Sequence, residues 1–220
     1  MRSKRAFRTS LATALLALAL GATAQESRPQ EAEIRQLLSE FTRSAGVEAR
    51  FVEEKHMALL AAPLVAKGTI YFDPPGSLAR HTSAPASSRL LITTDRVTFT
   101  DAHGTQVLEL GARPVVRSFV ESFVTLLRGD FDALDRRYEM ALFIPKAAGH
   151  WQLTLRPRSG PMARVFDRLV VRGAHRTIEQ FVAYERDGDH TVTRFSGVNP
   201  ARTFSDAERQ RLFTVPESTP

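Results

Sequence analysis

Alternating apolar and polar residues between positions 47 and 85 predict extended strands joined by turns. The alternation is clearest where Ala66, Gly68, Ile70 and Phe72 share one face and mostly polar residues stand between them. We therefore expect a sheet with one apolar face and one face in water. Such a sheet is stable only when another part of the chain covers its apolar face.

The strand pattern extends through most of the chain and predicts about eleven short strands. Turn-forming glycine, proline and aspartate separate them. The predicted strands are residues 47–60, 64–73, 77–84, 89–94, 96–101, 105–110, 137–146, 150–157, 165–173, 177–186 and 190–198. This order predicts a mainly β fold with added helices, built on one large antiparallel sheet.

Helical periodicity interrupts the strands at two main places. Residues 31–44 carry apolar side chains at i, i+3, i+4 and i+7 and are followed by Gly46, which predicts an amphipathic helix. Residues 115–128 follow Pro114 and predict a second helix. Its apolar positions cover more than the stripe of an ordinary surface helix, so we expect it to be covered on most sides.

Two shorter helices complete the predicted elements. One is expected at residues 131–136, where Asp130 is placed to cap it. The other follows Ser205, which forms a capping-box pair with Glu208. Helices therefore precede the first strand, divide the strands into two groups and follow the last one.

The N-terminal 24 residues predict a cleaved secretory signal peptide. Four cations precede the apolar run Leu11–Leu20, and Ala22-Thr23-Ala24 forms a small-x-small cleavage site. A membrane span needs about 20 apolar residues, so we favour a cleaved signal over a retained anchor. Lys4 stands where a twin-arginine signal has its first arginine, which favours the general secretory route.

Composition then limits the partners and the compartment. Removing the four signal-peptide cations from the formal charge of +6 leaves +2, so basicity gives no reason to expect nucleic-acid binding. The chain has no cysteine, which excludes disulfides, thiolate metal sites and a lipid-modified cysteine. We expect a periplasmic monomer with one domain at residues 25–216 and a frayed tail at 217–220.

Several short motifs occur in a characteristic order. They are Phe51–Lys55, Gly68–Leu78, Leu91-Ile92, Val97–Phe99, Leu126–Asp130, Trp151–Pro157 and the hairpin at Asp187–Asp189. In this order and spacing they resemble the LolA family of periplasmic outer-membrane lipoprotein carriers. The resemblance covers nearly the whole mature chain.

The resemblance implies an incomplete antiparallel β-barrel whose concave face is covered by a helical lid. It also implies a cavity for lipoprotein acyl chains, an inner-membrane donor, an outer-membrane acceptor and transient membrane contact. One position departs from the family. Its better-known members carry an arginine that holds the lid, and here Pro74 occupies that place. Arg80 and Arg89 are the candidates to replace it.

Apolar residues on the predicted strands and on the central helix are the candidate site. The cavity lining is predicted to be Phe51, Ile70, Phe72, Leu78, Leu91, Phe99, Met140, Trp151 and Leu153, and the lid residues Val116, Phe119, Val120, Phe123 and Leu127. The pattern alone fits a packed core equally well, and the resemblance favours a cavity. A lid that fills the empty cavity would make lipid binding reversible.

Residues for catalysis or metal binding are not found in a recognisable pattern. The sequence has no G-x-S-x-G elbow and no H-E-x-x-H motif. Its six histidines are scattered, at His56, His81, His103, His150, His175 and His190. His56 and His81 are the pair that neighbouring strands could bring together, although structural roles are the simpler expectation. We expect Glu53 and Glu54 to be an ordinary solvated pair, although a carboxylate near the cavity mouth could steer a cationic segment of the cargo.

Three functions remain open at this point. The first is a carrier that binds acyl chains without covalent chemistry, cofactor or metal. The second is a sensor or interaction domain that uses the same half-barrel to bind lipidated components and report to a membrane partner. The third is a periplasmic acyl-ester hydrolase, for which no reactive group of residues is found. We therefore predict that the protein is not an enzyme.

Overall fold

The computed structural model describes residues 27–42, 45–74, 76–146 and 149–214. The predicted signal peptide at residues 1–24 and the tail at 217–220 lie outside them. The described strands are β1 (Val47–His56), β2 (Leu64–Asp73), β3 (Ser77–Ala84), β4 (Ser88–Ile92), β5 (Arg96–Asp101), β6 (Gly104–Glu109), β7 (Tyr138–Phe143), β8 (His150–Pro157), β9 (Phe166–Ala174), β10 (Thr177–Glu185) and β11 (His190–Asn199).

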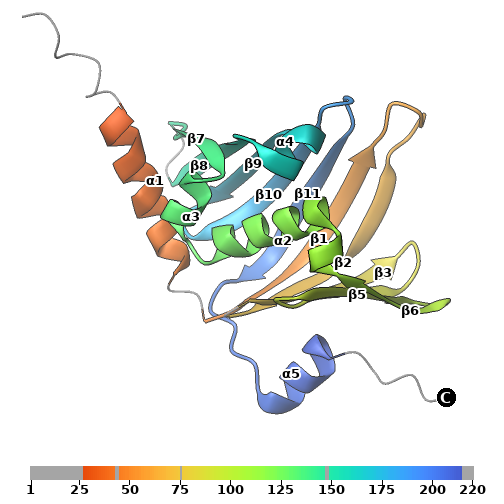
Figure 1. The fold of residues 1–220 in the computed structure, drawn as a ribbon. Helices are drawn as coiled ribbons and strands as arrows, with labels where there is room; N and C mark the ends of the chain where they lie inside the picture. The colour runs from red at the N-terminus through yellow and green to blue at the C-terminus, as the bar shows by residue number, and fades with distance from the viewer. Residues whose placement is uncertain (1–26, 43–44, 75, 147–148, 215–220) are drawn as a thin grey trace, which may run out of the picture.

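These eleven strands form one open antiparallel sheet, in the order β6-β5-β4-β3-β2-β1-β11-β10-β9-β8-β7. Each half of the chain is a meander, and the pairing of β1 with β11 joins the two halves. Within the described chain β6 and β7 are the edge strands, so the sheet is not closed (Figure 1). The predicted fold class, an incomplete barrel with helices on its concave face, is confirmed.

The first strand ends earlier than the sequence predicted. Strand β1 stops at His56, and Lys55 pairs with Leu64 at the start of β2. Residues 57–63 therefore form the connection between two paired strands, and the apolar residues 57–60 are not part of the sheet. Apolar character alone predicted a longer strand, because it does not show where the partner strand begins.

The described helices are α1 (Ser27–Phe41), the 3-10 turn η1 (Leu110–Ala112), α2 (Pro114–Leu127), α3 (Phe131–Asp135), α4 (Gly160–Val165) and α5 (Asp206–Phe213). Helix α2 crosses the concave face, while α1 and α3 lie towards β7 (Figure 1). The short helix α4, with Pro161 in its first turn, was not predicted. It connects β8 to β9 and contacts α2.

A packed core fills the concave face on the β7–β10 side of the sheet. It joins the apolar faces of α1 and α3 to the strands, and its members are Ile34, Leu38, Phe41, Leu126, Phe131, Leu134, Tyr138, Trp151, Leu153, Leu155, Met162, Leu169, Val171, Phe181 and Ala183. The ring of Trp151 contacts Phe41 edge-on at 5.8 Å. A Cβ at Gly173 would lie 2.4 Å from that indole, so glycine is required there.

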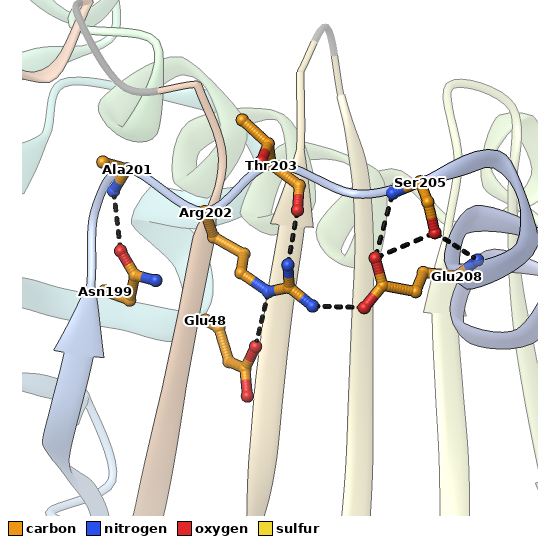
Figure 2. Close-up of polar contacts among 7 residues, drawn as sticks. All are labelled: Glu48, Asn199, Ala201, Arg202, Thr203, Ser205 and Glu208. Atoms are coloured by element: carbon orange, nitrogen blue, oxygen red, sulfur yellow. Dashed lines mark hydrogen bonds and ion pairs between the residues drawn. The ribbon is translucent and has the colours of Figure 1, made fainter.

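The C-terminal segment crosses to the convex face and places α5 there. Phe204 contacts the rings of Tyr71 and Phe213, and Arg209 pairs with Asp73 at 2.9 Å. Arg202 donates to Glu48 of β1 at 2.8 Å and to Glu208 of α5, and both contacts are drawn in Figure 2. The predicted capping box of Ser205 and Glu208 is confirmed. Arg202 therefore links the start of α5 to the sheet.

We expect Arg202→Ala to loosen this C-terminal segment. The pKa of the Glu208 carboxyl is lowered to about 2 from its ordinary 4.5. The hydrogen bond from the backbone N–H of Ser205 is the largest cause and the hydrogen bond from Arg202 is the second. A lowered folded-state pKa means that the ionic link is complete above about pH 4.5 and is lost as the pH falls through about 2. Limited proteolysis near neutral pH should cut the α5 segment faster in Arg202→Ala.

The control for that experiment is Arg211→Ala, because Arg211 is exposed on the same helix. Its α5 segment should be cut at the wild-type rate. Equal protection of wild type and Arg202→Ala would contradict the proposed link.

Candidate functional site

Two adjoining cavities lie between α2 and the concave face of the sheet. We call the cavity beside Phe41 of α1, of about 60 Å³, the inner cavity, and the one that extends to Glu185 and Thr191, of about 300 Å³, the outer cavity. Ile70, Leu78, Phe123 and Phe195 line both, so these side chains mark the boundary between them. The cavities together form one mostly apolar space beneath the central helix.

Strand alternation explains how β1 and β2 build this space. Val47 and Ala49 line the inner cavity, and Phe51 and Glu53 line the outer one, because every second residue faces the same side. A Cβ at Gly68 would lie 2.9 Å from the ring of Phe51 and 2.0 Å from a backbone oxygen. Glycine at this position therefore leaves the space in which the Phe51 ring packs.

Helix α2 covers the outer cavity with its own aromatic side chains. The Phe119 ring lies 5.6 Å from that of Phe166 and 6.2 Å from that of Phe181, and Phe123 contacts Phe181 at 5.8 Å. Val120 also lines the outer cavity. Much of the space on the concave face is thus filled by side chains of the covering helix.

Most predicted lid residues face the cavities. Phe119, Val120 and Phe123 line the outer cavity, and Leu127 lines the inner one. Val116 is 36% exposed and lies outside both linings. Val124, which the predicted lid set omits, faces the outer cavity.

The predicted lining residues separate into three groups. Phe51, Ile70, Phe72 and Leu78 line the cavities. Trp151, Leu153 and Met140 are packed in or against the core beneath α1 and α3, on the same face of the sheet. Phe99 pairs with Leu90 and lines a third hollow of about 360 Å³ near the β3–β4 turn, which shares Arg80 and Leu90 with the outer cavity. Binding by any of these residues stays a prediction.

Leu91 is on the wrong face for the predicted lining. It lies on the convex face beside His81 and Leu212 of α5. Its neighbours Leu90 and Ile92 face the outer cavity instead. Three consecutive apolar residues give no alternation, so the sequence did not show which of them point inward.

Several cavity residues on β10 and β11 were missed by the sequence prediction. They are Ile178, Phe181, Ala183, Phe195 and Val198. Register shifts interrupt the pairing beside Glu179 in β10 and near Gly197 in β11. A bulge inserts one residue and reverses the faces of the later residues in the strand, so a two-residue pattern is hidden.

A polar cluster lies inside the outer cavity, where Arg80 meets Glu53. The guanidinium of Arg80 donates to both carboxylate oxygens of Glu53, at 2.9 and 3.2 Å, and the hydroxyl of Thr193 donates to the same carboxylate at 3.1 Å. Arg80 also lies 4.3 Å from the centre of the Phe51 ring. The cavity therefore combines an apolar interior with charged hydrogen-bonding groups on its wall.

This cluster corrects the expectation that Glu53 and Glu54 form a solvated pair. The two carboxylates lie on opposite faces of β1, and Glu54 pairs with Arg194 at 2.7 Å on the convex side. Only Glu53 lines the cavity. Adjacent residues of a strand point to opposite faces, so sequence neighbours need not share an environment.

Side chains of α2 are joined to the segment that begins β7. The hydroxyl of Tyr138 donates to Ser122 at 2.6 Å, and Ser122 donates to the carbonyl of Ser118 at the same distance. Glu121 pairs with Arg137 at 3.0 Å. These contacts hold the covering helix from the β7 side.

Neither candidate for the missing family arginine holds α2 by a described hydrogen bond. Arg80 is paired with Glu53, and Arg89 borders the hollow on the convex face that His81 and Leu212 also line. Pro74 lies in the turn between β2 and β3. The contacts from Tyr138 and Arg137 are thus the polar attachment of α2 in the described chain.

Tyr138→Phe should lower the free energy of unfolding by about 0.5–1.5 kcal/mol, because it removes a buried hydrogen bond. Burial also raises the pKa of the Tyr138 hydroxyl above its ordinary value of 10.0. A raised folded-state pKa gives stability that is complete below pH 10 and is lost as the pH rises through the folded-state value. Denaturant unfolding at about pH 8 and about pH 11 measures the stability that each protein loses between the two pH values. This loss should be smaller for Tyr138→Phe than for wild type.

The control is Tyr184→Phe, because Tyr184 is a partly exposed tyrosine on the convex face. It should keep the alkaline stability loss of the wild type. If Tyr138→Phe retained both the stability and the pH dependence of the wild type, the attachment of α2 through Tyr138 would be refuted.

The histidines do not form a reactive group. His56 stacks on His190 at 4.5 Å, while His81 lies beside α5, where burial lowers its pKa. The predicted possibility that His56 and His81 converge is therefore wrong.

Among the described residues no cluster of three or more His, Cys, Asp and Glu is arranged to hold a metal ion. None of the described helices is long and apolar enough to span a membrane.

An open antiparallel half-barrel, with a helix over apolar cavities on its concave face, defines the class of protein to which this chain belongs. A family model described as "Outer membrane lipoprotein carrier protein LolA-like" matches residues 26–213. The chain belongs to this family, as the sequence resemblance predicted. A search of curated proteins found no match.

Solved structures share the fold at low sequence identity. MucB matches with a TM-score of 0.51 and 13% identity, over 86% of this chain and 64% of MucB. The Pseudomonas aeruginosa MucA/MucB complex matches at 0.50 and 13%, over 87% of this chain and 67% of that chain. A putative outer membrane lipoprotein-sorting protein domain from Vibrio parahaemolyticus matches at 0.50 and 9%, over 84% and 98%. These similarities show a common fold.

Proposed function

We propose that this protein is a periplasmic carrier that binds the acyl chains of lipoproteins, or of a related lipid, beneath α2. It would move them from an inner-membrane donor to an outer-membrane acceptor without covalent chemistry. The observation that carries the proposal is the apolar space on the concave face, which is covered and partly filled by Phe119 and Phe123. The LolA-like family supports lipid or lipoprotein binding in general.

The size of the cavities is consistent with a movable cover. The outer cavity, at about 300 Å³, is at the lower end of the range for small-molecule pockets. An acyl chain would need more room, which α2 provides if Phe119 and Phe123 leave the concave face. Burying each CH₂ contributes about 0.8 kcal/mol, and returning these phenylalanines to the cavity offsets part of that gain on release. Cargo would then pass to a tighter acceptor without ATP.

The polar cluster of Arg80, Glu53 and Thr193 fits a ligand that is not purely hydrocarbon. The charged donors and acceptors on one wall can form hydrogen bonds with a head group, while the acyl chain of the ligand contacts Ile70 and Leu78. A cavity for hydrocarbon alone would gain nothing from a half-buried ion pair, whose removal from water is costly. We therefore propose an amphiphile as cargo.

A second candidate function is an interaction domain that senses lipidated components. The specific support is that MucB, which has the same fold, occurs in a complex with MucA. In this alternative the half-barrel would bind a membrane partner and would not transport lipid.

Lipid analysis of the protein purified from periplasm tests the carrier proposal. A carrier should contain acyl lipid at close to one equivalent, which organic extraction and mass spectrometry would detect. A sensor should instead retain a membrane-protein partner in affinity purification. Absence of acyl lipid, both after purification and after incubation with lipoprotein or phospholipid, would contradict the carrier proposal.

A further inference from the structure

The connection between β1 and β2 exposes a continuous apolar segment at one end of the sheet. Residues 57–66 contain no charged side chain. Leu59 is 91% exposed and Leu64 57% exposed, and Leu60 and Val65 are also exposed. We call residues 57–65 the hairpin tip. Exposed apolar side chains grouped in one place are unfavourable in water and mark interaction surfaces.

The hairpin tip is held in place by hydrogen bonds. The backbone N–H of Leu60 donates to the carbonyl of Met57 at 3.0 Å, which closes a tight turn. The backbone N–H of Ala58 donates to the carboxylate of Asp189 at 2.9 Å, which joins the tip to the β10–β11 hairpin. In Figure 1 both hairpins extend past α2 at the same end of the sheet. The apolar side chains are therefore presented from a fixed support.

The outer cavity reaches the same end of the molecule. Glu185, the last residue of β10, and Thr191, near the start of β11, both line it. Lys55, at the base of the hairpin tip, pairs with Glu185 at 3.6 Å. A surface that bound the hairpin tip would thus lie next to this end of the outer cavity.

We propose that the hairpin tip inserts into the surface of an anionic lipid bilayer and positions the outer cavity for lipid exchange. This proposal rests on the proposed carrier function. It assigns membrane docking to residues 57–65 and an orientation in which the uncharged β1–β2 and β3–β4 turns face the lipid, while the charged β10–β11 turn stays at the level of the head groups.

The chemistry of the hairpin tip fits lipid better than a protein partner. Its side chains are Met, Ala, Leu, Pro and Val, whereas the binding hot spots of protein interfaces are enriched in Trp, Tyr and Arg and poor in Leu and Val. Lys67 on β2 and Lys55 on β1 flank it, and Lys55 also pairs with Glu185. Lysines at the base of an apolar insertion can reach lipid phosphates while their alkyl stems stay in the apolar zone.

The neighbouring β3–β4 turn extends the uncharged surface. Residues 83–88 carry no charge, and the hydroxyl of Ser83 donates to the backbone carbonyl of Lys67 in β2. Two adjacent uncharged turns give a broad surface that would meet lipid without burying an unpaired charge. The acidic side chain of Asp189, which contacts the tip, is engaged with the Ala58 N–H.

Docking would also shorten the path of a lipid through water. Each exposed CH₂ of an acyl chain costs about 0.8 kcal/mol in water. When the tip is inserted, a chain that leaves the bilayer can enter the outer cavity directly at the end lined by Glu185 and Thr191. The hairpin tip would thus raise the rate of loading, while the cavity sets the affinity.

Flotation with vesicles tests the proposal. Purified protein should float with vesicles of phosphatidylethanolamine and phosphatidylglycerol, and less with vesicles of phosphatidylcholine alone. Leu59→Asp should reduce the bound fraction by about tenfold or more, because it places a carboxylate among the lipid chains. The matched control is Phe143→Asp, since Phe143 is 62% exposed on the edge strand β7, away from the hairpin tip. It should float like the wild type.

Two further measurements separate this proposal from the carrier function. Leu59→Asp should still bind a fluorescent fatty acid added from solution, and should take lipid from vesicles more slowly than wild type. Wild-type flotation by Leu59→Asp would overturn membrane docking, whatever its fatty-acid binding. If neither the wild type nor the variants bind the fatty acid, the carrier function is overturned instead. A wild-type dimer that Leu59→Asp dissociates would assign the tip to a second copy of the chain and overturn the proposal.

Discussion

Phe123→Glu is expected to abolish acyl-chain loading while the sheet stays folded. Phe123 lines both cavities and packs against Phe181. A carboxylate in this position would have to be buried without a partner when the cavity is occupied by hydrocarbon. We expect binding of a fluorescent fatty acid to fall by at least about tenfold, as measured by titration.

The matched control is Val116→Glu, on the same helix but 36% exposed and outside both cavity linings. It introduces the same charge and should bind fatty acid like the wild type. Circular dichroism should show the same β content in both variants. Unchanged loading by Phe123→Glu would show that the ligand does not enter the space beneath α2.

Leu153→Ala is expected to lower the free energy of unfolding by about 2–5 kcal/mol. Leu153 has 0% exposure and lies in the packed core with Trp151 and Leu155. Truncation removes buried methyl groups and leaves a cavity that the surrounding core cannot fill. The folded fraction should bind fatty acid like the wild type, because Leu153 lies outside the two cavity linings. Denaturant unfolding and ligand titration check the two parts separately.

A leucine in a contrasting environment provides the control. Leu59→Ala changes a side chain that is 91% exposed and should alter stability by less than about 0.5 kcal/mol. If Leu153→Ala left stability unchanged and abolished loading, Leu153 would belong to the ligand site, as the sequence predicted, and the packed-core placement would be wrong.

The sequence was sufficient to predict the architecture. Two-residue alternation identified the strands, and the apolar density of residues 115–128 identified the helix that crosses the concave face. These predictions succeeded because strand faces and helix faces have different periods that a single sequence displays. The capping box at Ser205 was also recognisable, since it depends on local chemistry alone.

The allocation of residues between cavity and core could not be predicted in the same way. Trp151 and Phe51 are both aromatic residues on the concave face, but α1 packs against the first, while the second lines the outer cavity. Which part of a sheet a helix covers depends on contacts between distant segments. Apolar and polar residues also alternate over residues 151–156, and this pattern indicates that the apolar side chains are buried without showing which element covers them.

Local irregularities account for the other differences. The bulges beside Glu179 and Gly197 shift the faces of β10 and β11, so Phe181, Phe195 and Val198 were missed. Arg80 was considered only as a substitute for the family's lid arginine. Its pairing with Glu53 depends on β1 and β3 both facing the cavity across β2, a relation that becomes visible when the strand register is known.

Photocrosslinking with a fatty acid that carries a diazirine on its chain tests the proposed site most directly. Peptide mapping after loading from solution should find the label on β1–β3 and on α2, at positions that include Phe51, Ile70 and Phe123. Phe123→Glu should abolish this labelling. Label confined to exposed apolar residues such as Phe143 or the hairpin tip, or labelling unaffected by Phe123→Glu, would contradict an acyl-chain site beneath α2.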